Sequence, residues 1–405
     1  MASENQHVVL AMPSPSTLRA PAVWITARSW ALAVAERFGD ARVVTPDGSW
    51  APSQLTELID SMLSGTAGVP RRRSRLVTEV RTFAKDIRIS ARHAYGSRRT
   101  DGIRDPSQPF VWQHHDFFFT LGSRLARAAD LPLVQFVDAP HVWEARRWGV
   151  SRSMWGRVLE RAGEVPQLKE ADLVVCVSEG VAEAVQEIVG RTTRVVVTPC
   201  TADPLFFSDS TEREAVRQRL GFADSDVIVG WTGSFRRFHA VEQLINAFAQ
   251  IDELGHGVEL VLIGDGPDRQ RLEELASRSP ASDAITFTGQ IPYSQMRDHV
   301  AALDVAVLTA REDAEFHYSP LKLREYRASG RAIIAPHVGQ VAATLTDGGD
   351  ALLYPAGDIN LLSAHIQSLA SDAALRARLG AASRADELAR GGTQTQVDLV
   401  LAELR

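Results

Sequence analysis

The sequence predicts an α/β protein built from two doubly wound, parallel-sheet domains. Short β-branched runs alternate with amphipathic stretches of helical spacing, and this alternation restarts after Pro199. A chain of 405 residues is also longer than one hydrophobic core usually supports. In open α/β sheets, ligands bind beyond the carboxyl ends of the strands. We therefore expect the site in a cleft between two Rossmann-like domains.

The first half contains the weaker form of this pattern. Strands are predicted at 8–12, 42–45, 110–114, 133–137, 173–178 and 194–198. The segments between them with helical spacing are 22–37, 53–63, 117–129 and 180–189. Alternating β and α elements favour a parallel sheet with helices on both faces. This half is assigned to an N-terminal domain, residues 1–199.

The second half is more regular. Strands are predicted at 227–231, 258–263, 285–288, 305–308, 333–335 and 352–354. Helical segments are predicted at 212–220, 241–251, 268–277, 293–303, 320–329, 341–345 and 359–369. We assign residues 200–375 to a C-terminal domain and residues 376–405 to terminal helices that are expected to return to the N-terminal domain.

Composition excludes several classes of function. The chain is 45% hydrophobic and 23% charged, and no stretch approaches the roughly 20 apolar residues of a membrane span. Residues 1–6 lack the basic start of a secretory signal, so a cytoplasmic location is expected. A net charge of -6 disfavours general nucleic-acid binding. Cys176 and Cys200 lack the spacing of a zinc site and are interpreted as buried thiols.

One segment carries most of the functional signal. Residues 317–330 read HYSPLKLREYRASG and are followed by Arg-Ala-Ile-Ile-Ala. This segment resembles the donor-site signature of the retaining family-4 glycosyltransferases, the glycosyl transferases group 1, which often reads S-P-x-K-x-x-E-Y-M-A-x-G. Other segments resemble the same family in the same order, over roughly residues 108–360: 138–144, 171–178, 233–239, 262–267, 287–292 and 302–307.

The resemblance implies a GT-B fold and a reaction. A protein of this family transfers a sugar from a nucleotide diphosphate sugar to an acceptor, with retention of anomeric configuration. The donor is a co-substrate bound by the C-terminal domain, and neither a cofactor nor a metal ion is implied. The acceptor, which the sequence does not identify, is bound by the N-terminal domain. Positive groups take the place of the metal beside the departing diphosphate.

The local chemistry of residues 319–325 agrees with this implication. Ser319 is a good helix N-cap and Pro320 is favoured at the first helical position, so a helix begins there. Lys322 then falls in the first turn, where a bound phosphate would offset its unfavourable position in the helix dipole. Glu325 lies on the same face and offers only acceptors to two ribose hydroxyls. The alternatives are a Lys322 and a Glu325 exposed to solvent.

Further donor contacts follow from the resemblance alone. The loop after the first strand of the second half supplies an arginine and a lysine or histidine to the diphosphate, and one of its two adjacent arginines is expected to be an ordinary surface residue. Residue 269 is Arg where a dinucleotide fingerprint would have its third glycine. The complete set of donor-binding candidates is Ser234, Arg236, Arg237, His239, Gly266, Gln290, Ile291, Ser319, Pro320, Leu321, Lys322 and Glu325.

Three candidates concern the reacting sugar and the acceptor. Asp138 follows a predicted strand and could orient either substrate, although it could also cap a helix. Glu144 matches the acceptor-side segment of the family. His317 stands where the family has a glutamate, so we expect a different donor sugar, or else a ring that only packs beside Tyr318. Ala240 is a second departure, because glycine commonly occupies that position.

A basic segment, residues 71–99, stands apart from these motifs. It contains ten Arg or Lys residues against two acids, a local charge of 10 − 2 = +8, and its apolar residues share a helical face: Val77, Val80, Ala84, Ile87 and Ala91. The first interpretation is a packed helix with a solvated basic face. The second is peripheral contact with an anionic lipid at the inner membrane face, or with an anionic acceptor.

Two other functions remain open at this point. One is a different GT-B enzyme, such as a nucleotide-sugar epimerase or a phosphorylase. The other is a donor-binding module without turnover, which the histidine at position 317 keeps in consideration.

Overall fold

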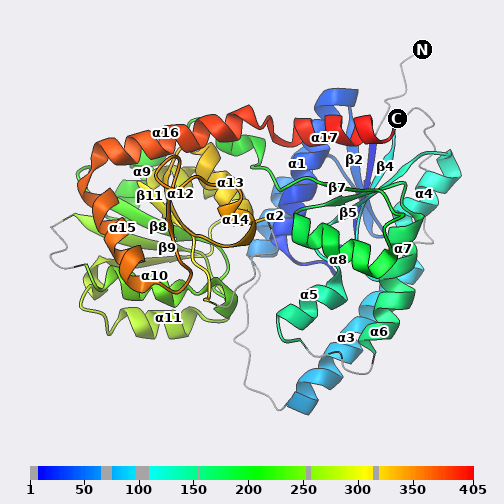
Figure 1. The fold of residues 1–405 in the computed structure, drawn as a ribbon, viewed down its shortest axis with the longest axis horizontal. Coiled ribbons are helices and arrows are strands. Elements are labelled where there is room, and N and C mark those ends of the chain that lie inside the picture. Colours follow the sequence, from blue (N-terminus) through cyan, green and yellow to red (C-terminus); the bar gives the residue numbers. More distant parts are fainter. Residues whose placement is uncertain are drawn as a thin grey trace.

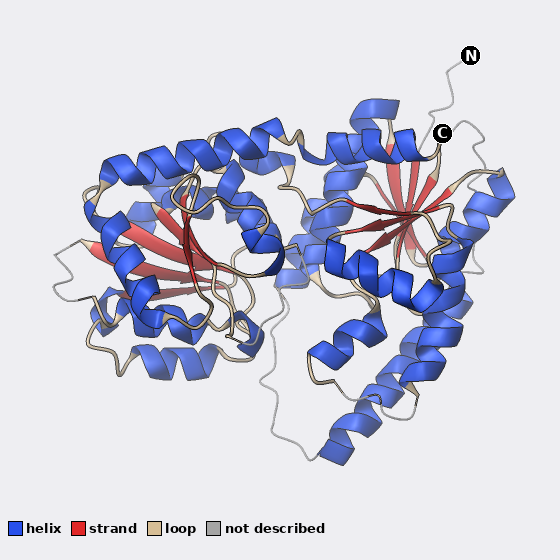
Figure 2. Ribbon diagram, viewed as in Figure 1, coloured by secondary structure: helices blue, strands red, loops and turns tan. Residues whose placement is uncertain are grey.

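The computed structural model describes residues 8–64, 75–96, 109–150, 152, 155–251, 257–312 and 319–405. Two α/β domains lie side by side (Figure 1). In each domain a twisted sheet is covered by helices on both faces (Figure 2). The two-domain α/β architecture predicted from the sequence is therefore confirmed.

The first sheet has the strand order β3-β2-β1-β4-β5-β6-β7 in the described residues. Its strands are β1 (Val8–Ala11), β2 (Ala41–Thr45), β3 (Gly48–Trp50), β4 (Val111–His114), β5 (Leu133–Val137), β6 (Leu173–Cys176) and β7 (Val195–Val197). All pairs are parallel except β2 with β3, which is antiparallel. The short edge strand β3 was not predicted, although the Pro46-Asp47-Gly48 turn before it is typical of a hairpin.

Three of the helical segments predicted in the first domain, 22–37, 53–63 and 180–189, correspond to helices, whereas the helices at 141–147, 156–158 and 165–170 were not among the predicted segments. The helices of the first domain are α1 (Pro21–Phe38), α2 (Leu55–Leu63), α3 (Arg75–Gly96), α4 (Leu121–Ala129), α5 (His141–Arg147), α6 (Gly156–Val158), α7 (Val165–Glu170) and α8 (Glu179–Val189). The predicted helix at 117–129 begins only at Leu121. Phe117 and Phe119 are buried in the preceding turn, and Phe118 has a positive φ of 53° that a helix cannot contain.

The second sheet is entirely parallel, with the order β10-β9-β8-β11-β12-β13. Its strands are β8 (Val227–Thr232), β9 (Val258–Ile263), β10 (Ile285–Gly289), β11 (Val305–Val307), β12 (Ala332–Pro336) and β13 (Leu352–Tyr354). Its helices are α9 (Arg213–Arg219), α10 (Val241–Phe248), α11 (Arg269–Ala276), α12 (Tyr293–Ala302), α13 (Leu321–Ala328), α14 (Gly339–Ala342) and α15 (Ile359–Ser371).

The end of the chain ties the two domains together. Helix α16 (Ala373–Ala389) runs along the second domain, and α17 (Gly392–Glu403) lies against α1 of the first (Figure 1). The guanidinium of Arg194 donates to the backbone carbonyl of Glu403. A second junction joins α2 to α12, where the Asp60 carboxylate accepts a 2.7 Å hydrogen bond from the Ser294 hydroxyl. The relative position of the domains is thus held by direct contacts.

Helix α3 packs through its polar side. Asp86 and His93 are buried, whereas Val80 and Ile87 are 60% and 52% exposed. The interpretation of the apolar stripe as a packed face is therefore wrong for these positions. Five of the basic residues (Arg71, Arg72, Arg73, Arg98 and Arg99) and the side chains of Arg75 and Val77 lie outside the described residues. In the part of the chain that the structure describes, no helix is long and apolar enough to cross a membrane.

Candidate functional site

The carboxyl ends of β8, β9 and β10 are joined by backbone contacts between their loops. The Gly233 N–H donates to Ile263 at 2.9 Å, and the Gly264 N–H donates to Gly289 at 3.0 Å. A Cβ on Gly264 would lie 1.9 Å from the Gly233 carbonyl oxygen, so the two loops approach too closely for any larger residue. The predicted Gly266 serves the same contact, since a Cβ there would lie 2.6 Å from the backbone of Phe235.

Helix α13 presents its first turn to the end of β8. The helix begins at Leu321 with Pro320 as the capping residue, and no side chain caps it. Ser319 differs from its expected capping role, because its hydroxyl accepts a 3.0 Å hydrogen bond from the Cys200 N–H in the segment that joins the domains. The predicted helix start is thus displaced by one residue, and Lys322 still occupies the first turn.

Lys322 lies at the centre of this edge. Its Nζ is 3.5 Å from the ring centroid of Trp231, a cation–π contact. A Cβ on Gly233 would be 2.9 Å from the same Nζ, so the glycine makes room for the ammonium group. Burial lowers the pKa of Lys322 to about 7, against the attraction of Glu325. Among the described residues, no ion pair neutralises Lys322.

Glu325 is only 6% exposed, which excludes the solvated surface glutamate considered above. Burial and the nearby Asp203 raise the pKa of Glu325 to about 7, and Lys322 opposes this shift. Asp203 itself pairs with Arg28 of α1. The N-terminal domain therefore contributes to the charges around Glu325 through the segment that joins the domains.

The two arginines of the loop after β8 have different contacts. Arg237 lies 3.6 Å from Asp268 and its side chain is 73% exposed. Arg236 is exposed, contacts the Ser234 hydroxyl at 3.3 Å and has no acidic partner in the described residues. Burial, together with Lys322 and Arg236, lowers the pKa of His239 to about 2, so its imidazole is neutral.

The remaining donor candidates occupy the neighbouring strand ends. Ala240, which replaces the usual glycine, has the left-handed conformation with φ of 50°, and this explains why glycine is favoured there. Gln290 is exposed after β10, and Ile291 packs on the hydrophobic core. His317 lies outside the described residues, so the expectation for its role stays a prediction.

The carboxyl ends of β4 and β5 form a second polar cluster. His114 ends β4, and its Nε2 lies 2.9 Å from the carboxylate of Asp138, which follows β5. The Asp138 side chain is 37% exposed. Electrostatic repulsion from Asp138 is one reason why the pKa of Cys200 is raised to about 12, after the larger effect of burial, so Asp138 lies toward the junction of the domains.

A buried network supports this cluster from behind. Glu164 accepts hydrogen bonds from the backbone N–H groups of His141 and Val142 at 2.6 and 3.2 Å and thereby caps α5. His115 contacts the same carboxylate at 3.1 Å. Burial is the largest influence on His141 and opposes its charged form, but Asp116 at 3.4 Å and Glu164 together outweigh burial and raise the pKa of His141. The predicted acceptor residue Glu144 is half-buried on α5 and adds to this shift.

The two edges meet through aromatic side chains. Trp148, which follows α5, packs on Phe238 with ring centroids 4.4 Å apart. Phe238 in turn lies 4.2 Å from the ring of His239. Sequence reasoning missed Trp231, Trp148 and the His114 partner of Asp138. The run His114-His115-Asp116 at a strand end was the available signal for the last of these.

In the described residues, no group of three or more His, Cys, Asp or Glu side chains is arranged to hold a metal ion. Both free cysteines are buried, and Cys176, like Cys200, has its pKa raised to about 12 by burial.

Comparison with known proteins places these two domains and their facing edges in the GT-B class. Residues 212–386 match the family model of glycosyl transferases group 1. The match covers less than half of the chain and shows that this part is similar to that family, and the two domains together have the GT-B fold.

Individual relatives are distant. The chain is 27% identical over 308 residues to D-inositol 3-phosphate glycosyltransferase of Stackebrandtia nassauensis, covering 67% of this chain and 68% of that one. It is also 28% identical to 2-deoxystreptamine N-acetyl-D-glucosaminyltransferase of Streptomyces fradiae, but that match covers only 45% of this chain and 43% of the relative. The crystal structure of HepE from Anabaena in complex with UDP is 16% identical, with a TM-score of 0.65 over 98% of this chain and 99% of that one.

Proposed function

We propose that the chain transfers a sugar from a nucleotide diphosphate sugar to an acceptor, with retention and without a metal ion or other cofactor. The observation that carries this proposal is that Lys322 and Glu325 lie on the same turn of α13, at the ends of β8 to β10. Lys322 has no ion-pair partner among the described residues, which suits a diphosphate, and the carboxylate of Glu325 beside it suits the hydroxyls of a ribose. HepE, which shares the fold, has been crystallised with UDP and with UDP-glucose.

In this proposal each group has one task. Lys322 and Arg236 stabilise negative charge on the departing diphosphate, and Glu325 accepts hydrogen bonds from the ribose hydroxyls. The bond between the anomeric carbon and the diphosphate oxygen breaks, and its electron pair leaves with the nucleotide. The acceptor oxygen bonds to the same face of the sugar and loses its proton to the leaving phosphate. Asp138, held by His114, orients the acceptor or the reacting sugar.

The first test is a thermal-shift screen of nucleoside diphosphate sugars, since a ligand at about 100 times its dissociation constant stabilises the fold by roughly 2.7 kcal/mol. Donors that bind are then assayed for transfer, and the anomeric configuration of the product is read by NMR. We expect an unchanged rate after exhaustive chelation. Loss of activity with EDTA that magnesium or manganese restores would contradict the metal-free mechanism.

The alternative functions give different results in the same assays. Turnover of the donor that requires inorganic phosphate would identify a phosphorylase, and donor hydrolysis without any acceptor would favour an epimerase. Donor binding with no transfer to a broad acceptor panel would indicate a binding module.

A second proposal concerns peripheral contact with an anionic membrane surface. It is favoured by the exposed side of α3, where Val80, Ile87 and Tyr95 project beside the exposed Lys85 and Arg88. Apolar and basic side chains on one helix suit the surface of a bilayer rich in anionic lipid.

Vesicle flotation at low salt tests the membrane contact. We expect binding to phosphatidylserine vesicles and not to phosphatidylcholine vesicles. The double variant Val80→Ser/Ile87→Ser should release the protein, while Arg191→Gln, an exposed position between α8 and β7, should not. No binding to anionic vesicles at low salt would contradict the contact.

A further inference from the structure

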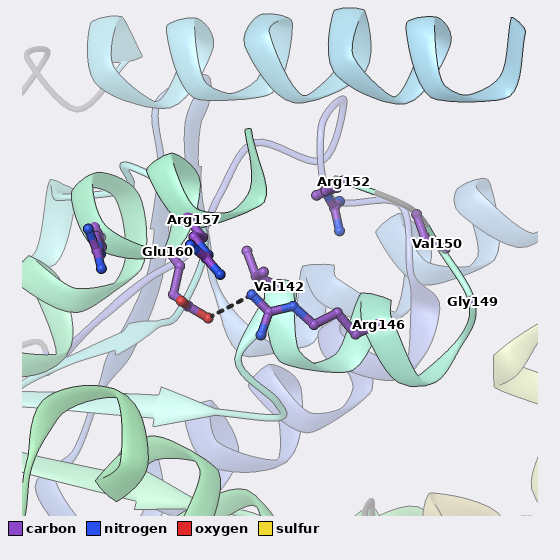
Figure 3. A pocket seen from close by; sticks show the side chains of 8 residues that line it. Val142, Arg146, Gly149, Val150, Arg152, Arg157 and Glu160 are labelled. Atoms are coloured by element: carbon purple, nitrogen blue, oxygen red, sulfur yellow. Dashed lines mark ion pairs between the residues drawn. The ribbon is translucent and has the colours of Figure 1, made fainter. Parts of the chain in front are cut away.

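Besides Lys322 and Arg236 at the ends of β8 to β10, a second group of basic residues lies in the first domain. A pocket of about 580 Å³ opens between α5, residues 149, 150 and 152, and the helical segment 156–161, and four arginines line it: Arg146, Arg152, Arg157 and Arg161. Figure 3 shows the pocket with side chains converging from these three segments. Glu160 is the acidic residue of its lining.

The arginines of this pocket are incompletely neutralised. Arg146 lies 3.6 Å from Glu160, beyond hydrogen-bond distance. Arg157 and Arg161 are exposed and have no acidic partner among the described residues. Counting Glu160 and the Asp86 that pairs with Arg152, four positive charges face two negative ones, an excess of 4 − 2 = +2. A phosphate monoester carries about −1.5 to −2 at neutral pH and would balance this excess.

Arg152 is held in place before any ligand arrives. Its guanidinium makes two hydrogen bonds to Asp86 of α3, at 2.7 and 3.1 Å, and the indole N–H of Trp155 donates to the same carboxylate at 2.8 Å. The third guanidinium nitrogen, Nη1, is buried and has no hydrogen-bond partner in the described residues. Protein atoms enclose this nitrogen, so Arg152 contributes its positive charge to the pocket lining and not a free donor.

The pocket adjoins the reacting edges. Helix α5, which forms one wall, begins three residues after Asp138 and is seven residues long, or about 10 Å. The loop residues Gly149 and Val150 of the lining follow Trp148, which packs on Phe238 of the donor loop. A molecule with a hydroxyl near Asp138 could therefore extend a charged group along α5 into the pocket.

We propose that this pocket binds a phosphate group of the acceptor, so that the acceptor is a phosphorylated molecule. Guanidinium groups match phosphate by bidentate hydrogen bonds, and the exposed Arg157 and Arg161 supply such donors. This inference rests on the proposed function, because it assigns the acceptor side of the same reaction. The phosphate is carried either by a soluble molecule or by a lipid headgroup, since both offer the same dianion.

The test measures binding of glycerol 1-phosphate by calorimetry, which requires neither a donor nor turnover. We expect wild type and Lys322→Ala to bind it equally and Arg157→Gln/Arg161→Gln to bind it at least tenfold more weakly. The control Arg191→Gln/Arg278→Gln removes the same charge from exposed positions elsewhere and should bind normally. No binding by wild type, binding lost in Lys322→Ala alone, or equal loss in the control would overturn the proposal.

Two further measurements separate this proposal from the proposed function and identify the source of the phosphate. Donor affinity should be unchanged in Arg157→Gln/Arg161→Gln, so a failure to find any donor leaves the phosphate test valid. Vesicles with phosphatidic acid should bind wild type better than the double variant if the phosphate belongs to a lipid. Equal vesicle binding by both proteins, together with the calorimetric loss, would assign the site to a soluble phosphate.

Discussion

The strand ends of the two domains carry opposite kinds of charge arrangement. At the C-terminal domain, Lys322 and Arg236 have no ion-pair partner in the described residues. At the N-terminal domain, His114 lies against Asp138 and Glu164 against His115. The cations of the first edge have no acidic partner among the described residues, so we call it the incomplete edge. Each of these two acids of the second edge contacts a histidine, so we call it the paired edge. In the proposed function, a ligand that supplies negative charge completes the first edge, and the second edge is preorganised to orient a hydroxyl group.

The largest expected effect concerns the incomplete edge. Lys322→Ala removes the cation beside the diphosphate, and we expect kcat to fall by about 10²- to 10³-fold, the loss typical of one group that stabilises a developing anion. The measurement is the rate of sugar transfer at saturating donor. Lys169→Ala removes an exposed lysine of α7 and serves as the control. A comparable loss in both variants would show that the effect of Lys322→Ala is not specific to its place at the end of β8.

The second prediction concerns the contribution of Glu325 to donor affinity and to the pH dependence of that affinity. Glu325→Gln should weaken donor affinity by about 1 to 3 kcal/mol, because the amide offers one acceptor where the carboxylate offers two. Below pH 7 the wild-type carboxyl becomes protonated, since its pKa is raised to about 7. Above pH 7 Lys322 loses its charge, since its pKa is lowered to about 7. Donor affinity should therefore be greatest near pH 7 and fall on both sides.

The variant separates these two effects. In Glu325→Gln the decline toward acid should disappear, while the decline toward alkali should remain because Lys322 still titrates. Titration of donor binding from pH 5 to 9 checks both. A pH profile that is identical in wild type and variant would show that Glu325 does not contact the donor.

Much of the fold was predictable because each strand of a buried parallel sheet is a continuous apolar run. The ends of β5, β9 and β13 were predicted to the residue. Errors occurred where tertiary packing decides. Phe117 and Phe119 read as part of a helix, yet the structure buries both in a turn. The exposed stripe on α3 was interpreted as packed, because periodicity identifies a helix face and not what covers it.

The arrangement of residues at the ends of β8 to β10 was also more predictable than that at the ends of β4 and β5. Lys322 and Glu325 are three residues apart on one helix, so local spacing places them together. The cation–π contact of Lys322 with Trp231 and the pairing of Arg237 with Asp268 join separate segments, and no local pattern predicts them. The His114 and Asp138 pair depends on the order of the strands, which single-sequence reasoning did not determine.

Substitutions of Asp138 and His114 test the paired edge. Asp138→Asn preserves shape but removes the negative charge, and we expect kcat to fall about tenfold with donor affinity unchanged. This is less than the roughly 10²- to 10⁴-fold typical of a group that transfers a proton, because Asp138 only orients a substrate in the proposed function. His114→Gln should lower kcat less, because the carboxylate remains and only its orienting partner is lost. Parallel measurement of kcat and of donor dissociation constant checks both variants. A weakened donor affinity in Asp138→Asn would assign this residue to the donor and not to the acceptor.

The smallest expected effect separates two adjacent arginines in the incomplete edge. Arg236→Ala should weaken donor binding several-fold, because this guanidinium lies near enough to lower the pKa of His239 and has no acidic partner among the described residues. Arg237→Ala should change donor affinity less than twofold, since its exposed side chain pairs with Asp268, and such surface pairs contribute about 0 to 1 kcal/mol. Each variant removes one charge from the same loop, so each serves as the control for the other. Donor dissociation constants measured at low and high salt decide between them. Equal losses would mean that the loop acts through its total charge, and a larger loss for Arg237→Ala would mean that donor binding breaks its contact with Asp268 and uses Arg237 in place of Arg236.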